Sequence, residues 1–145
     1  MKIALMLTAF ASAAAATDAT QCYGLLQHAL DAKNPDTRKS AVVASSLVAN
    51  DSPLILRLAD MLEDKDVQVR VAVVTTLAEV KTPIATSALR RALKDKVPEV
   101  SFAAAKALYA TGDPDGKAAL LSVMEGDTKA SSGFFTAEKR EALRM

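Results

Sequence analysis

The sequence has few of the residues on which covalent and metal-binding chemistry depends. Its 145 residues include one cysteine, one histidine and no tryptophan. A single cysteine cannot form a disulfide within the chain, and one cysteine with one histidine cannot complete a tetrahedral zinc site without carboxylate ligands. The 18 lysines and arginines are balanced by 17 aspartates and glutamates, which excludes nucleic-acid binding driven by a bulk excess of positive charge.

Glycine, proline and aromatic residues are also scarce, whereas alanine, valine and leucine dominate. There are five glycines and five prolines, and aromatic residues make up 4% of the chain. This composition favours helices over strands, and the length is that of one domain. We therefore expect an all-α protein.

Residues 1–16 have the three parts of a secretory signal peptide. Lys2 supplies a positive charge, residues 3–10 are mostly apolar, and residues 11–16 are small. The segment is too short to span a bilayer, which takes about 20 residues, although it could instead be a buried first helix. We predict cleavage after Ala13 or Ala16, a periplasmic or secreted protein, and no stable membrane insertion after cleavage. Cys22 would then lie near the new N-terminus, either as a small apolar residue or as a thiol that pairs between chains.

A repeat of about thirty residues follows. Segments 30–38, 62–70 and 93–101 align without gaps, and their leading leucines are 32 and then 31 residues apart. Each segment precedes a stretch rich in alanine and valine that ends at a proline-containing breaker. A fixed period of this length is typical of stacked helical repeats.

Each repeat is expected to form a helical hairpin. In the second repeat, apolar residues at helical spacing predict a first helix over Leu54–Glu63. A turn at residues 64–66 leads to a second helix from Val67 to about Val80, whose N-terminus Asp66 can cap. Such a hairpin is apolar on more than one side and must stack on its neighbours. The fold prediction is therefore an α-α superhelix, a solenoid of about three helical hairpins, within a domain of residues 17–126.

The first and third repeats start their second helices differently. Asn34 takes the capping position in the first repeat and is followed by Pro35, which suits the first helical position. Val97 replaces the capping residue in the third repeat. We expect that helix start to be weaker by about 1 kcal/mol.

The pattern Leu62-x-Asp64-x-Asp66-x-x-Val69-Arg70-x-Ala72 resembles the short HEAT repeat of phycobilin-lyase-like proteins, and the resemblance covers roughly residues 24–126. It implies that Asp66 and Arg70, with Arg38 in the first repeat, form bonds between repeats. The third repeat departs from the family pattern, because Val97 and Ser101 replace the aspartate and the arginine.

No catalytic constellation is evident in the sequence. Cys22 precedes His28 by six residues, which is not a spacing that brings two side chains together on a helix. Residues 113–116 superficially resemble a calcium loop but lack its later ligands, and we interpret them as a turn. The mixed charges that include Arg90 and Arg91 fit a solvated face. We therefore predict a protein that is not an enzyme and has no metal or cofactor.

Stacking in register would instead create a binding surface along the second helices. The positions that follow the repeated Arg or Ser, and those three residues later, should share the face away from the hairpin core. We predict a partner-binding stripe of Val71, Val74, Phe102 and Tyr109. The alternative is that Phe102 and Tyr109 pack on the segment after residue 116.

The C-terminal part of the chain does not complete a fourth repeat. Residues 116–124 should form its first helix, whereas residues 127–145 predict a loop and a C-terminal helix. Phe134 and Phe135 are then either docking anchors or a lid over the last hairpin. The chain is expected to be truncated or to dock its last helix on another molecule.

The predicted function is that of an exported, non-catalytic scaffold that binds a protein partner and no nucleic acid. The resemblance implies an alternative, a bilin-lyase-like protein that binds a tetrapyrrole. A third interpretation is a structural fragment of a longer HEAT-repeat protein. A visible absorption spectrum recorded with added bilin separates the first two, since only a tetrapyrrole-binding protein would shift it.

Overall fold

The computed structural model describes residues 21–48 and 52–125, and this part of the chain contains helices and no strand. Residues 21–30 are helical. The elements that follow are α2 (Pro35–Ala44), the 3-10 helix η1 (Ser45–Val48), α3 (Ser52–Asp60), the 3-10 helix η2 (Met61–Glu63), α4 (Val67–Val80), α5 (Pro83–Ala92), α6 (Pro98–Ala110) and α7 (Pro114–Met124). The prediction of an all-α chain of helical hairpins is confirmed.

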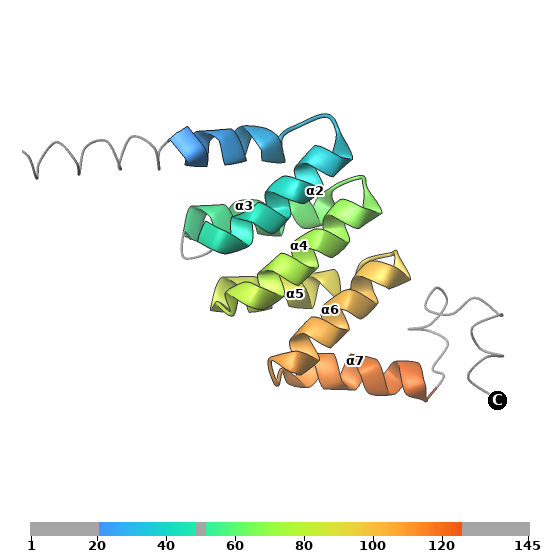
Figure 1. The fold of residues 1–145 in the computed structure, drawn as a ribbon. Coiled ribbons are helices and arrows are strands. Elements are labelled where there is room, and N and C mark those ends of the chain that lie inside the picture. The colour runs from blue at the N-terminus through green and yellow to red at the C-terminus, as the bar shows by residue number, and fades with distance from the viewer. Residues whose placement is uncertain (1–20, 49–51, 126–145) are drawn as a thin grey trace, which may run out of the picture.

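The helices form two layers. The second helices of the repeats, α2, α4 and α6, lie side by side in chain order, and the first helices α3 and α5 pack against each other and against this row (Figure 1). Helix α4 is the centre of the arrangement because it contacts α2, α3, α5 and α6. Each hairpin therefore packs on the next, as expected for a solenoid.

The second repeat matches the predicted boundaries closely. Helix α4 spans Val67–Val80 as expected. The predicted first helix over Leu54–Glu63 is found as α3, Ser52–Asp60, followed by η2, Met61–Glu63. The last turn is thus a tighter 3-10 turn, a common ending for a helix.

The core consists of small and branched side chains at equivalent positions of successive repeats. Val69, Val73 and Leu77 on α4 have no exposed surface, and neither do their counterparts 31 residues later. Those counterparts are Val100, Ala104 and Leu108. Short side chains at the contacts allow neighbouring helices to approach closely, so the alanine-rich composition is a requirement of the stacking.

The helix starts have the caps that the sequence predicts. The Asn34 side chain accepts a hydrogen bond from the backbone N–H of Asp36 at 2.8 Å. The Asp66 carboxylate accepts from the N–H groups of Gln68 and Val69 at 2.9 and 3.1 Å. Val97 at the start of α6 makes no side-chain cap bond.

Substitution of Val97 by threonine is expected to raise the free energy of unfolding by about 1 kcal/mol. The backbone at Val97 already has the extended geometry of a capping residue, with φ −95° and ψ 118°. Threonine keeps one methyl group and adds the missing acceptor. For a chain of this size the melting temperature should rise by about 2–4 °C, as measured by circular dichroism. The reciprocal variant Asp66→Val should lower it, and an unchanged melting temperature in both variants would contradict the capping argument.

The junction between the second and third repeats is a sharp helix-to-helix turn. Lys81 ends α4 in the left-handed conformation, with φ 51°. Thr82 then adopts an extended backbone, as expected before a proline, and its hydroxyl accepts from the N–H of Ala85 at 3.2 Å. The predicted breaker of residues 81–83 therefore also caps α5.

The fourth repeat begins earlier than predicted. Helix α7 starts at Pro114, two residues before the expected Gly116, and the Asp113 side chain caps it by accepting from the N–H of Asp115 at 3.0 Å. The interpretation of residues 113–116 as a turn was wrong because an aspartate followed by proline is also a helix start. The turn lies at Thr111 and Gly112, where Gly112 has φ 80°.

Several predictions fall outside the described residues. The signal peptide of residues 1–16 is one, and the loop and helix of residues 127–145 are another, with Phe134 and Phe135 among them. They stay predictions. None of the helices in residues 21–48 and 52–125 has the length and apolar character of a membrane span.

Candidate functional site

Three residues of the predicted stripe, Val71, Phe102 and Tyr109, lie on one side of the row formed by α2, α4 and α6. We call this side the second-helix face. Val71 on α4 and Phe102 on α6 occupy equivalent repeat positions on adjacent helices, and both are partly buried. Tyr109 near the end of α6 is 58% exposed. These three residues are placed where a partner could contact them.

Val74 does not belong to this surface. Its side chain is 1% exposed, and the residues at the same repeat position on the neighbouring helices, Val42 and Ala105, are 0% and 1% exposed. These equivalent positions are buried on all three second helices, so the prediction that Val74 binds a partner was wrong. Nearby on α4, the Thr76 hydroxyl donates to the carbonyl of Val42 on α2 at 3.3 Å.

The second-helix face extends further than the predicted stripe. Val43 on α2 is 56% exposed. Val43 occupies the repeat position of Thr75 and Lys106, both of which are exposed. The repeat register could therefore have identified Val43.

Polar groups border the apolar positions of this face. The Lys106 ammonium lies 5.9 Å from the centroid of the Phe102 ring, close enough for a cation–π attraction. The Gln68 amide donates to the Glu99 carboxylate at 3.2 Å and so links α4 to α6. Partly exposed apolar groups with a polar border are the usual composition of a protein-binding surface.

A ladder of arginine–aspartate pairs connects the loops of successive repeats. The Arg38 guanidinium donates to both carboxylate oxygens of Asp64, at 2.7 and 2.8 Å, and to the carbonyls of Ala32 and Lys33. The Arg70 guanidinium donates to both oxygens of Asp95, at 2.8 and 3.2 Å, and to the carbonyl of Asp64 at 2.7 Å. Both arginines are 6% exposed. The prediction that Arg38 and Arg70 bond between repeats is confirmed.

Asp66, however, is not a member of the ladder. Its carboxylate is occupied by the backbone N–H groups at the start of its own helix, and Asp64, two residues earlier, pairs with Arg38. The prediction of an inter-repeat bond from Asp66 was wrong. The third repeat also contributes to the ladder although it has Val97 at the position of Asp66. Its acceptor is Asp95, which pairs with Arg70.

The environment of Asp64 keeps the pair ionised. Burial raises the pKa of this carboxyl, but hydrogen bonds from Arg38 and from the Asp66 N–H more than compensate, so its pKa lies below the ordinary value. The same hydrogen bond raises the pKa of Arg38 against the opposing effect of burial. The Arg38–Asp64 pair is therefore a fixed, neutralised pair of charges and a structural feature of the repeat junction.

The third hairpin makes further charged contacts besides the ladder pair Arg70–Asp95. Ser101 replaces the ladder arginine, and its hydroxyl donates to the carbonyl of Pro98 within its own helix. Arg90 pairs with Asp113 at 2.7 Å and with Asp115 at 3.3 Å, while Arg91 donates to the carbonyl of Ala59 at 2.7 Å. Arg90 and Arg91 are both exposed, in agreement with the predicted solvated face, and they make these contacts in addition.

Two similar cavities lie along the loops that join the first to the second helix of each repeat. We call this border, formed by residues 31–34, 63–66 and 94–97, the loop edge. A cavity of about 620 Å³ lies between the second and third loops, and one of about 590 Å³ lies between the first and second. The paired arginines Arg38 and Arg70 line these cavities, so the ladder forms part of their walls.

Cys22 and His28 lie at the start of the described chain and belong to no metal-ligand group found there. Cys22 is a free, exposed cysteine and His28 is exposed, and both lie on the helix of residues 21–30. Across residues 21–48 and 52–125, no group of three histidine, cysteine, aspartate or glutamate side chains could hold a metal ion.

Comparison with known proteins gives one family match. The family model described as "HEAT repeats" matches residues 55–131, which is more than half of the chain and includes all of α4, α5, α6 and α7. No curated protein matches the chain significantly.

Proposed function

Because the chain belongs to the HEAT-repeat family, we propose that it is a non-catalytic scaffold that binds a protein partner on its second-helix face. Proteins of this family commonly serve as interaction scaffolds. Fold alone does not determine function, so the proposal depends on a surface suited to the role. The observation that carries it is the register of α4 and α6, which places the partly exposed Val71 and Phe102 at matching positions of adjacent helices.

The residues that would carry the contact are Tyr109, Phe102, Val71 and Val43. Large aromatic side chains supply much of the binding free energy at protein interfaces. Tyr109 and Phe102 lie seven residues apart on α6, two helical turns, so they fall on the same side of that helix. A partner seated there would cover Val71 and Val43 on the neighbouring helices.

Site-specific photo-crosslinking in the native envelope fraction tests this proposal. A benzophenone amino acid replaces exposed Thr75, which lies on α4 within the second-helix face, or exposed Ser87, which lies on α5 in the other layer. We expect an adduct of one defined mass from position 75 and not from position 87. The double variant Phe102→Ser and Tyr109→Ser should lose that adduct.

Melting temperatures distinguish a binding role from a packing role. If Phe102 and Tyr109 mainly pack within the molecule, the double variant will lose much of its thermal stability and keep the adduct. That result, or equal adducts from positions 75 and 87, would refute the proposed surface.

The compartment is part of the same proposal. We propose that the scaffold acts in the periplasm or outside the cell, on the strength of the signal-like sequence of residues 1–16. Intact mass measurement of the protein from its native host should give a chain that begins at Ala14 or Thr17. A chain that retains Met1 and fractionates with cytoplasmic proteins would contradict export.

A further inference from the structure

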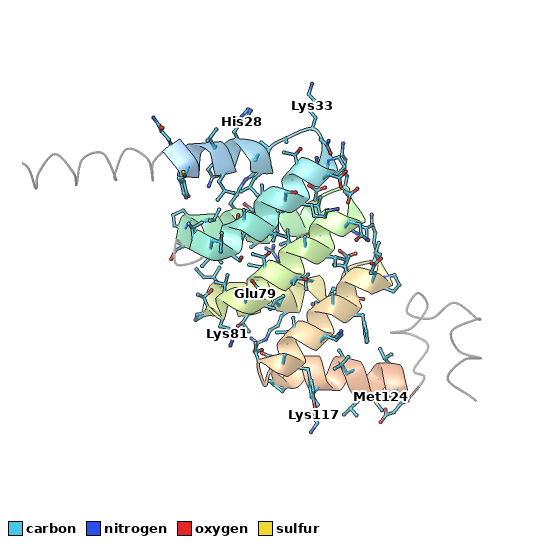
Figure 2. All side chains as sticks on the ribbon, in the orientation of Figure 1. His28, Lys33, Glu79, Lys81, Lys117 and Met124 are labelled. Atoms are coloured by element: carbon cyan, nitrogen blue, oxygen red, sulfur yellow. The ribbon has the colours of Figure 1, made fainter. Side chains whose placement is uncertain are left out.

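Each of the three intra-repeat loops carries a lysine at the same position. Lys33, Lys65 and Lys96 follow the leading leucine of their repeats by three residues, and all three are exposed. The loops succeed one another along one side of the molecule (Figure 1), and Lys33 extends outward from the first of them (Figure 2). The loop edge therefore presents one lysine per repeat.

Two of these lysines stand on loops of fixed and equivalent shape. The Asp64 carboxylate accepts from the N–H of Asp66, and the Asp95 carboxylate accepts from the N–H of Val97, each at 2.8 Å. Lys65 and Lys96 are the central residues of these two closed turns. The ladder arginines hold the same carboxylates from the other side. The loop backbone is therefore already ordered, so binding of a ligand to these lysines would cost little conformational entropy.

The cavity between Lys65 and Lys96 has an excess of basic groups. Its charged lining consists of Lys65, Arg70, Arg91, Lys94 and Lys96 with Glu63, Asp64 and Asp95. Arg38 and Arg70 neutralise Asp64 and Asp95, so exposed Glu63 is the acid that remains in that lining. The cavity between Lys33 and Lys65 also has Asp31 and Asp60 in its lining, so the positive potential is concentrated between Lys65 and Lys96.

From this arrangement we propose that the loop edge binds an acidic, extended segment of a protein partner, with a carboxylate side chain in the cavity between Lys65 and Lys96. The site is separate from the second-helix face and does not depend on it. A polypeptide fits better than a nucleic acid because Glu63 and Asp66 interrupt the basic groups. A peptide can place neutral residues against these acids, whereas a phosphate backbone has a charge at every step.

The spacing of the repeats suggests which peptide conformation fits. Packed helices lie about 8–10 Å apart, so equivalent loop residues of stacked repeats are separated by a similar distance. In a polyproline II helix, residues three apart lie on the same side and about 9 Å apart. A segment with an acidic residue at every third position could therefore place its carboxylates beside successive lysines.

Fluorescence anisotropy at low ionic strength tests the site with defined probes. The ligand is a labelled peptide of four Glu-Pro-Pro units, with a Gln-Pro-Pro peptide and a twelve-residue oligothymidylate for comparison. The double variant Lys65→Gln and Lys96→Gln should bind the glutamate peptide about tenfold more weakly than the unmodified chain. The glutamine peptide should bind at least as weakly to the unmodified chain.

A matched control separates this site from general charge attraction. The double variant Lys81→Gln and Lys117→Gln removes the same charge from exposed positions at the end of α4 and on α7, where Lys117 points away from the molecule at the opposite end from Lys33 (Figure 2). It should bind the glutamate peptide as the unmodified chain does. Equal weakening in both double variants, no binding of the glutamate peptide, or tighter binding of the oligothymidylate would overturn the proposal. None of these results bears on crosslinking from position 75, so the two surfaces are tested independently.

Discussion

Replacement of Arg70 by methionine is expected to lower the free energy of unfolding by about 3–5 kcal/mol. The guanidinium is 6% exposed and holds the Asp95 carboxylate and the carbonyl of Asp64. Methionine fills much of the same space but donates no hydrogen bond, so a carboxylate that is 11% exposed would lose its counter-ion. Urea denaturation followed by circular dichroism measures the loss.

Arg57 provides a matched control for this experiment. It also pairs with an aspartate of a neighbouring repeat, Asp31, but the two side chains are 39% and 62% exposed. Exposed pairs contribute about 0–1 kcal/mol, so Arg57→Met should be nearly neutral. The double variant Arg70→Met and Asp95→Asn should regain part of the stability, since it leaves no unpaired buried charge. Equal losses of unfolding free energy from Arg57→Met and Arg70→Met would show that burial of an ion pair does not determine its contribution to stability.

The repeat and its helix boundaries could be predicted from the sequence because local chemistry decides them. Asp66 satisfies the free N–H groups of the residues that directly follow it, and Pro83 restricts the backbone of the residue directly before it. Neither effect depends on the rest of the molecule. The limits of α4 were therefore predicted correctly at both ends.

The partners of the ladder could not be predicted in the same way. Asp64 and Asp66 both precede α4, and each could in principle face the arginine of the preceding repeat. Capping occupies Asp66, which leaves Asp64 to meet Arg38 across 26 residues of chain. The choice between them depends on how two hairpins stack, and a single sequence does not record that.

The burial of Val74 has a related cause. Helix α4 is covered on both flanks by α2 and α6 and from behind by α3 and α5, so apolar residues occur nearly all round it. A helix of that kind lacks the contrast between an apolar and a polar side from which exposure is predicted. Tyr109 lies near the end of the last second helix that the structure describes, with α7 as its neighbour, and it remains 58% exposed.

Substitution of Gly116 by alanine is expected to destabilise the protein although alanine is the better helix former. In an open helix this exchange stabilises by about 1 kcal/mol. Here a Cβ atom would lie 2.4 Å from the backbone nitrogen of Tyr109 and 2.6 Å from the Cβ of Leu108. These atoms belong to α6 and cannot move aside as the end of a flexible side chain can. We expect α7 to be pushed off α6 at a net cost of about 1–3 kcal/mol, measured by urea denaturation.

Gly24 is the control because the chemical change is the same and only the surroundings differ. It lies in the helix of residues 21–30, is exposed, and has nothing within 4 Å of its Cβ position. Gly24→Ala should therefore stabilise the protein by about 0.5–1 kcal/mol. Hydrogen exchange of the α7 amides adds a local measurement, since Gly116→Ala should speed their exchange and Gly24→Ala should not. A stabilising effect of alanine at both positions would mean that α7 does not pack on α6 through this glycine.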